Sequence, residues 1–333
     1  MMSFEELEKE LKARQFRPLY WFAGEESFFI DRLVDIIEKT ALNEAERSFN
    51  QTILYGKDTD VGTVIASAKR YPMMAPHNVV IVKEAQQLKK IEELNAYAEN
   101  PLDSTILVLA SKHKAPDKRT KFYKTVNSKH VFFESKRLYD NQVPGWIEKQ
   151  LRLLHYKVSP KSVALLAEHV GSDLSKLYNE IEKLRIIVPE GGDITAEVIE
   201  KNVGISKDYN NFELTKALSQ RDVVRSNEII RYFAQNPKDH PLTVTIFTLY
   251  GFFSKLLILH TLNSTDQKVI ASKLKVNPFF IREYQTAARN YSLQKVVRII
   301  GYLRECDIRS KGIDNYGTSD ADLMKELMFK ILH

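Results

Sequence analysis

The first part of the chain alternates short apolar runs with stretches in which apolar side chains recur every three or four residues. An uninterrupted apolar run predicts a buried strand, and the longer period predicts a helix with one buried face. The predicted strands cover residues 18–23, 49–55, 79–82, 105–110 and 130–134. The predicted helices cover residues 1–15, 26–41, 61–70, 88–98 and 115–126. This alternation predicts an α/β domain with a five-stranded parallel sheet and helices on both faces.

Beyond Tyr139 the strand signals nearly stop and the helical period dominates. Four helices are predicted at residues 143–155, 161–170, 173–187 and 195–202, before a polar linker at 204–211. Further helices are predicted at residues 212–219, 222–234, 241–260, 266–274, 278–288, 292–310 and 321–332. The sequence therefore predicts three domains, at residues 1–139, 140–208 and 209–333, of which the second and third are helical.

The composition indicates the cellular compartment and the kinds of partner that the protein can bind. The 333 residues carry a formal net charge of +6, which permits contact with nucleic acid without requiring it. The one cysteine, Cys306, cannot form an intrachain disulfide and indicates a reducing, cytoplasmic compartment. The apolar stretch 242–259 approaches membrane-spanning length, but it contains several Thr and Lys255. A helix packed among other helices is the preferred interpretation, and no membrane partner is expected.

The junction between the first strand and the next helix is where an α/β nucleotide-binding protein has its phosphate loop. Such a loop needs several glycines and a Lys, but this junction reads Gly24-Glu25-Glu26. Its carboxylates suit the positive end of the helix dipole and repel a phosphate. After the buried strand 79–82, Lys83 stands where a nucleotide hydrolase has an acidic metal ligand. No catalytic residue, metal or cofactor is therefore expected in this chain.

A loop with two adjacent methionines follows the helix at 61–70. It reads Tyr71-Pro72-Met73-Met74-Ala75-Pro76, with prolines on either side of the methionine pair. A surface loop of this kind predicts an apolar plug for the pocket of a partner protein, because Met is flexible and polarizable. The alternative is that Met73 and Met74 fold back onto the sheet edge as part of the core. The sequence favours neither.

Two further features have both a functional and a structural interpretation. The segment 112–121 is basic, and its Lys118, Arg119 and Lys121 either contact nucleic-acid phosphate or form the solvated face of a helix. Phe279, near the start of a later helix, either stacks on a base or packs in the core. In both cases the structural interpretation is the more common one.

The order and spacing of several segments resemble the delta subunits of the bacterial DNA polymerase III clamp loader over nearly the whole length. The segments are LYWFAGEE at 19–26, PMM at 72–74, VVIVKEA at 79–85, GSDL at 171–174, EIEKL at 180–184, FELTKAL at 212–218 and DIRSK at 307–311. The resemblance implies a RecA-like AAA+ domain, a small helical lid domain and a helical collar domain that joins a hetero-pentamer. The implied partner subunits are the gamma or tau ATPases and delta-prime, and the implied setting is the bacterial cytoplasm, at the nucleoid during replication.

The resemblance also implies a function. Members of this family do not hydrolyse ATP; they bind the ring-shaped sliding clamp, the beta subunit, and help to hold one of its interfaces open. An apolar pair before the third strand enters a clamp pocket, which by position is Met73-Met74 here, flanked by Tyr71 and Pro72. The family commonly has a bulkier or aromatic residue in this pair. The complex encloses primer–template DNA and serves a DNA-directed DNA polymerase, a nucleotidyltransferase.

Two other functions remain as alternatives. One is an active AAA+-type ATPase or helicase loader with an unorthodox phosphate loop, which saturable ATP binding would indicate. The other is a stand-alone DNA-binding protein, which strong and steeply salt-dependent duplex binding would indicate.

Overall fold

The computed structural model describes residues 2–113, 115–139, 141–203, 206, 208–262, 264, 266–315 and 317–333. The chain divides into two compact units, Met1–Leu138 (unit 1) and Tyr139–His333 (unit 2). The predicted border between residues 139 and 140 lies one residue further along the chain. The predicted border between residues 208 and 209 lies inside unit 2, so the separation of lid and collar stays a prediction.

Unit 1 contains a five-stranded sheet in which every neighbouring pair is parallel, in the order β2-β3-β4-β1-β5. The strands are β1 (Leu19–Gly24), β2 (Gln51–Tyr55), β3 (Asn78–Lys83), β4 (Thr105–Lys112) and β5 (Val131–Ser135). The register aligns Gly24 with Lys112, so the carboxyl ends of β1 and β4 meet at one edge. The prediction of a five-stranded parallel sheet is confirmed.

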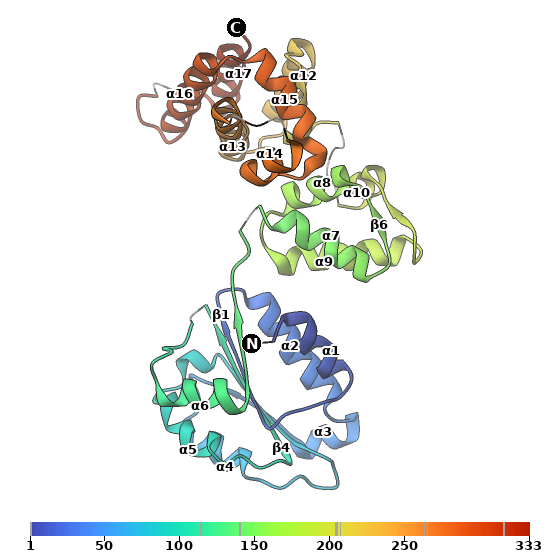
Figure 1. Cartoon of the computed structure of the whole chain (residues 1–333), viewed down its shortest axis with the longest axis vertical. Coiled ribbons are helices and arrows are strands. Elements are labelled where there is room, and N and C mark those ends of the chain that lie inside the picture. The colour runs from blue at the N-terminus through green and yellow to red at the C-terminus, as the bar shows by residue number, and fades with distance from the viewer. Residues whose placement is uncertain are drawn as a thin grey trace. The chain divides into compact units, whose positions relative to one another are not determined.

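Helices cover both faces of this sheet, as Figure 1 shows. Side chains alternate between the faces along β1: Trp21 joins one core cluster and Phe22 the other. The Phe22 cluster is completed by α1 (Phe4–Lys12) and α2 (Ser27–Thr40). The Trp21 cluster is completed by α4 (Val61–Ala68), α5 (Asn95–Ala98) and α6 (Lys121–Lys129).

Three local predictions in unit 1 are wrong. The helix expected at 88–98 is not continuous: Lys90, with a left-handed φ of 58°, separates the 3-10 turn η1 (Ala85–Gln87) from the 3-10 turn η2 (Ile91–Leu94), which leads into α5. The helix expected at 115–126 begins only at Lys121, where Thr120 caps it.

The third error concerns the strand expected at 49–55. A short helix, α3 (Glu44–Asn50), precedes β2 there. The sequence does carry its signal, an Asn43–Glu46 capping box in which each side chain accepts a hydrogen bond from the other residue's backbone N–H.

Unit 2 is mainly helical. Its first helices are α7 (Val143–Leu153), α8 (Pro160–Val170), α9 (Leu174–Ile187) and α10 (Ala196–Val203). A two-stranded parallel sheet of β6 (Lys157–Val158) and β7 (Asp193–Ile194) was not predicted. Of the predicted linker 204–211, residues 204, 205 and 207 lie outside the described residues. Asn210 caps the next helix, where the Glu168 carboxylate also accepts hydrogen bonds from the N–H groups of Asn211 and Phe212.

The rest of unit 2 packs around one core. Its elements are α11 (Asn211–Ser219), α12 (Val223–Gln235), α13 (Leu242–Thr261), α14 (Gln267–Leu274), η3 (Pro278–Phe280), α15 (Ile281–Asn290), α16 (Leu293–Ser310) and α17 (Asp320–Leu332). The continuous helix expected at 278–288 is thus a 3-10 turn followed by α15. Helix α13 is long and apolar enough to cross a membrane by length and composition. Its buried face joins this core, as expected for a helix packed among others.

Candidate functional site

The junction between β1 and α2 is tied to the end of β5. The backbone N–H of Glu25 donates to the Ser135 carbonyl oxygen over 2.8 Å, and the Ser135 hydroxyl donates to the Glu26 carbonyl oxygen over 2.6 Å. Gly24 has a φ of 140°, and a Cβ at this position would lie 2.0 Å from the Ser135 carbonyl oxygen. Glycine is required here so that two chain segments can approach closely, and not to form a phosphate loop.

The start of α2 is occupied by a side chain of the chain itself. The Glu26 carboxylate accepts a hydrogen bond from the backbone N–H of Phe28 over 3.2 Å and so caps the helix. Free N–H groups at this point are what a phosphate loop offers to a nucleotide. An incoming phosphate would have to displace the capping carboxylate and lie beside its charge.

Lysines at the carboxyl edge of the sheet pair with carboxylates of α2. The Lys83 ammonium lies 3.1 Å from Glu38, and the Lys112 ammonium lies 2.7 Å from Asp31. Lys83 therefore forms an internal ion pair at the position expected for an acidic metal ligand. Among the described residues, no group of three or more His, Cys, Asp or Glu side chains is arranged to hold a metal ion.

The loop between α4 and β3 presents its apolar side chains to solvent. The exposed fraction is 59% for Met73, 101% for Met74 and 76% for Tyr71, while Pro72 is half-buried. Neither side chain packs into the core, so the interpretation of the methionine pair as core is wrong, while its role as a plug for a partner stays a prediction. Exposed apolar side chains gathered on one loop are typical of a protein-binding surface.

Sequence reasoning missed the residue that fixes this loop. Asn50, at the end of α3, is 2% exposed, and its side-chain oxygen accepts a hydrogen bond from the Met73 N–H over 2.6 Å. Its amide nitrogen donates to the Met73 carbonyl oxygen over 3.0 Å. The two residues lie 23 positions apart, so only an unexplained buried Asn could have hinted at the contact.

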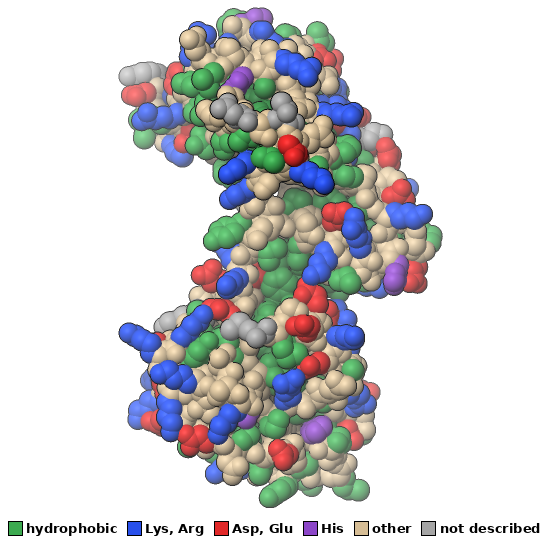
Figure 2. Space-filling view, viewed as in Figure 1, with side chains coloured by type: hydrophobic (Ala, Val, Ile, Leu, Met, Phe, Trp, Pro, Cys, Tyr) green, Lys and Arg blue, Asp and Glu red, His purple; other side chains and the backbone are tan. Residues whose placement is uncertain are grey.

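The basic residues proposed to face DNA are already paired. Lys and Arg side chains gather around α6 in Figure 2. Three of them contact carboxylates of unit 1, in the pairs Lys118–Glu134 at 3.0 Å, Arg119–Asp117 at 2.8 Å and Lys121–Glu99 at 2.6 Å. Hydrogen bonds from Arg119 lower the pKa of Asp117 to about 2. A DNA phosphate would compete with these carboxylates.

Phe279 belongs to the other unit. Its side chain is 60% exposed and contacts Phe280 edge-on, with ring centroids 5.1 Å apart. It is not core, so the more common interpretation of this residue is wrong. The three basic residues lie in unit 1 and Phe279 lies in unit 2, so each is described within its own unit.

Two family models match this chain. One, described as the DNA polymerase III delta subunit, matches residues 20–136, and the other, described as the C-terminal domain of that subunit, matches residues 208–329. Together they cover more than half of the sequence and include both the degenerate phosphate loop and the methionine loop. The chain belongs to the DNA polymerase III delta subunit family. It is therefore a subunit of the DNA polymerase III clamp loader, a complex of DNA replication.

The sequences of related proteins match this delta family member over most of its length. It is 26% identical to the DNA polymerase III subunit delta of Bacillus subtilis, covering 96% of this chain and 94% of the relative. It is 22% identical to a probable DNA polymerase III subunit delta of Mycoplasma genitalium, over 80% of this chain and 95% of the relative. The solved structure of the Bacillus subtilis DNA clamp loader delta protein matches with a TM-score of 0.57, at 24% identity and 99% coverage of each chain. The predicted fold class is confirmed.

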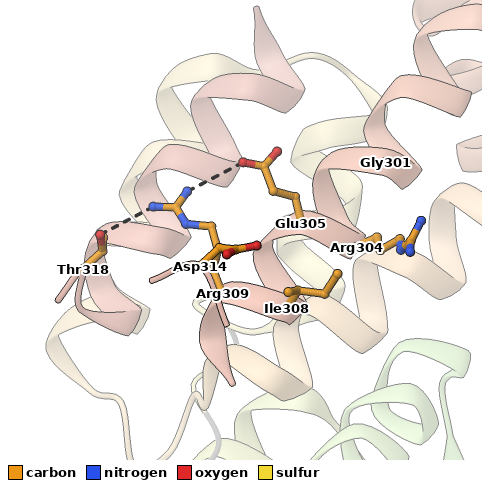
Figure 3. Close-up of a pocket in the computed structure, with 7 residues that line it drawn as sticks. All are labelled: Gly301, Arg304, Glu305, Ile308, Arg309, Asp314 and Thr318. Atoms are coloured by element: carbon orange, nitrogen blue, oxygen red, sulfur yellow. Dashed lines mark hydrogen bonds and ion pairs between the residues drawn. The ribbon is translucent and has the colours of Figure 1, made fainter. Parts of the chain in front are cut away.

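One hollow in unit 2 also contains charged side chains. It has a volume of about 570 Å³ and is lined by Gly301, Arg304, Glu305, Ile308, Arg309, Asp314 and Thr318 (Figure 3). Arg309 lies between Glu305, at 3.8 Å, and the Thr318 hydroxyl, at 3.5 Å. It also pairs with Glu326 of α17 at 2.8 Å. In the delta family member this cluster joins α16 to α17, and no predicted site residue lies in it.

Proposed function

We propose that this delta family member binds the sliding clamp, the beta subunit, through Met73 and Met74, with Tyr71 and Pro72 beside them. The observation that carries the proposal is the exposure of both methionines, 59% and 101%, on a loop whose backbone is hydrogen-bonded to a buried side chain. Burying one Met side chain contributes about 1.5–3 kcal/mol. Two such side chains supply a large part of the free energy of a specific interface.

Clamp opening follows if the methionine loop binds the open ring more tightly than the closed ring. A ligand shifts an equilibrium only by its differential affinity for the two states. The delta subunit then stabilises an open interface that the ring visits by itself, and no covalent chemistry is required of this chain. Loading onto primed DNA for the polymerase is the task of the complex.

Hydrolysis of ATP is proposed to belong to partner subunits. The Glu26 cap at the start of α2 and the Lys83–Glu38 ion pair are both unfavourable to a nucleotide with its metal ion. The partners implied by family membership are the gamma or tau ATPases and delta-prime, in a hetero-pentamer that encloses primer–template DNA.

Helix α13 offers a surface for those partners. Val244, Phe247 and Ile258 are 44%, 67% and 43% exposed, and their spacing places them on one side of the helix. The opposite side carries Leu249, Phe253 and Leu256 in the core. A helix that is buried on one side and exposes apolar side chains on the other is suited to contact with a neighbouring subunit.

The test is a double substitution, Met73→Ser with Met74→Ser, followed by a pull-down on immobilised sliding clamp. We expect clamp binding to weaken by about 100-fold or more, since most of the buried apolar area is lost. Assembly with the other loader subunits should be unchanged. The matched control is Ile186→Ser, which removes an 87% exposed apolar side chain from unit 2. Unchanged clamp binding by the double variant would refute the proposal.

A further inference from the structure

Asn50 forms three hydrogen bonds through its side-chain amide, which engage both donor hydrogens and the acceptor oxygen. The nitrogen donates to the Glu46 carbonyl oxygen and to the Met73 carbonyl oxygen, both over 3.0 Å, and the oxygen accepts from the Met73 N–H over 2.6 Å. An amide has two donor hydrogens and an acceptor oxygen, so none of these is left without a partner. Because the side chain is 2% exposed, water competes little for these bonds.

The contact between Asn50 and Met73 fixes the backbone of an exposed loop at one residue. The backbone N–H and C=O groups of Met73 are both hydrogen-bonded, as they would be in a β-sheet, although this residue lies in no strand. Met74 then adopts a φ of 53°, in the left-handed region that is unfavourable for a residue with a Cβ. Such a conformation persists only where the surroundings enforce it. The surroundings here are Asn50 on one side and Ala75, which packs against the core, on the other.

We propose that Asn50 is a positioning residue for the methionine loop, residues 71–76. Its amide holds Met73 and Met74 in the outward conformation before the clamp binds. A loop already ordered does not lose conformational freedom on binding. If only a fraction of the molecules hold the loop in the binding conformation, the apparent affinity is reduced by that fraction. This inference rests on the proposed function, because it takes the methionine pair to be the group that docks.

The variant Asn50→Ala tests the inference in the full chain. We expect its affinity for the sliding clamp to fall about tenfold, through slower association and with little change in dissociation, because the bound contacts are the same. A role confined to folding would instead lower the unfolding midpoint and leave the affinity of the folded fraction unchanged. The matched control is Asn78→Ala, which removes another buried Asn of unit 1 that bonds to the Ser67 carbonyl oxygen over 2.9 Å, not to the loop.

A second measurement needs no variant. In the wild-type chain labelled with ¹⁵N-methionine, the Met73 amide should exchange with solvent at least tenfold more slowly than the Met74 amide, although both side chains are exposed. Equal exchange rates would overturn the inference, even if Asn50→Ala does not fold. The inference would also be overturned if Asn50→Ala binds the clamp with wild-type affinity while the double variant Met73→Ser with Met74→Ser fails to bind. If the methionine variant itself binds normally, the proposed function and this inference both fall.

Discussion

At the residue scale, three residues occupy positions where a nucleotide-binding protein of this fold has its phosphate loop and its metal ligand. Gly24 allows β1 and β5 to approach, Glu26 caps α2, and Lys83 pairs with Glu38. Each of these could be noticed in the sequence as a departure from a phosphate loop. Glu26 acts on Phe28, two residues away, whereas the roles of Gly24 and Lys83 depend on the distant Ser135 and Glu38 and therefore appeared only in the structure.

Gly24→Ala should destabilise unit 1 by about 2 kcal/mol or more, because the new Cβ would lie 2.0 Å from the Ser135 carbonyl oxygen. Urea unfolding followed by Trp21 fluorescence, in a Trp146→Phe background, reports on unit 1 alone. The matched control is Gly301→Ala in the interior of α16, where a Cβ meets nothing within 4 Å. That control should leave the transition reported by Trp21 unchanged, because Gly301 lies in unit 2. Equal stability of Gly24→Ala and wild type would contradict the close approach.

Glu283 predicts a pH dependence of folding. Burial raises the pKa of its carboxyl from 4.5 to about 7. The folded chain therefore binds more protons than the unfolded chain between these values, and this contribution to the free energy of unfolding decreases as pH rises through that window. Glu283→Gln should consequently be more stable than wild type at pH 8, with the difference vanishing near pH 4.5. A difference between the two unfolding midpoints that does not vary with pH would show that Glu283 is not the titrating group.

At the element scale, long or fully buried elements were predictable and short ones were not. The strands β3 and β4 contain uninterrupted apolar runs, α16 has a clear helical period, and α13 is an apolar stretch too long for a strand. Their positions therefore follow from sequence pattern. Helix α3 has seven residues and the strands of the second sheet have two each, too few to show a period. The left-handed residue Lys90 interrupts an expected helix without glycine or proline, and the sequence carries no warning of that.

The exposed side of α13 gives a prediction at this scale. Phe247→Asp should weaken assembly with the other loader subunits by about tenfold or more, because a charge would be buried in an apolar contact. Its affinity for the sliding clamp should not change, since the methionine loop lies in unit 1. Size-exclusion chromatography of the reconstituted complex measures the assembly, with Ile186→Asp as the control. Loss of clamp binding together with assembly would show instead that the substitution disturbs the whole chain.

At the scale of the whole molecule, the two units divide the proposed work. Unit 1 has a five-stranded parallel sheet and displays an apolar loop for the proposed clamp contact, and unit 2 has the exposed helix surface that we propose for assembly. Family membership and fold class were predictable from ordered segments along the sequence. The direction of Met73 and Met74 was not, because it is set by a tertiary contact with Asn50.

The most direct test of the central claim is a calorimetric titration of the full chain against the sliding clamp with no nucleotide present. We predict saturable binding with a negative heat-capacity change, which marks burial of apolar surface. Met73→Ser with Met74→Ser should lose at least about 100-fold in affinity and most of that heat-capacity change. Binding that appears only after ATP is added, or a double variant that binds like the wild type, would contradict the account.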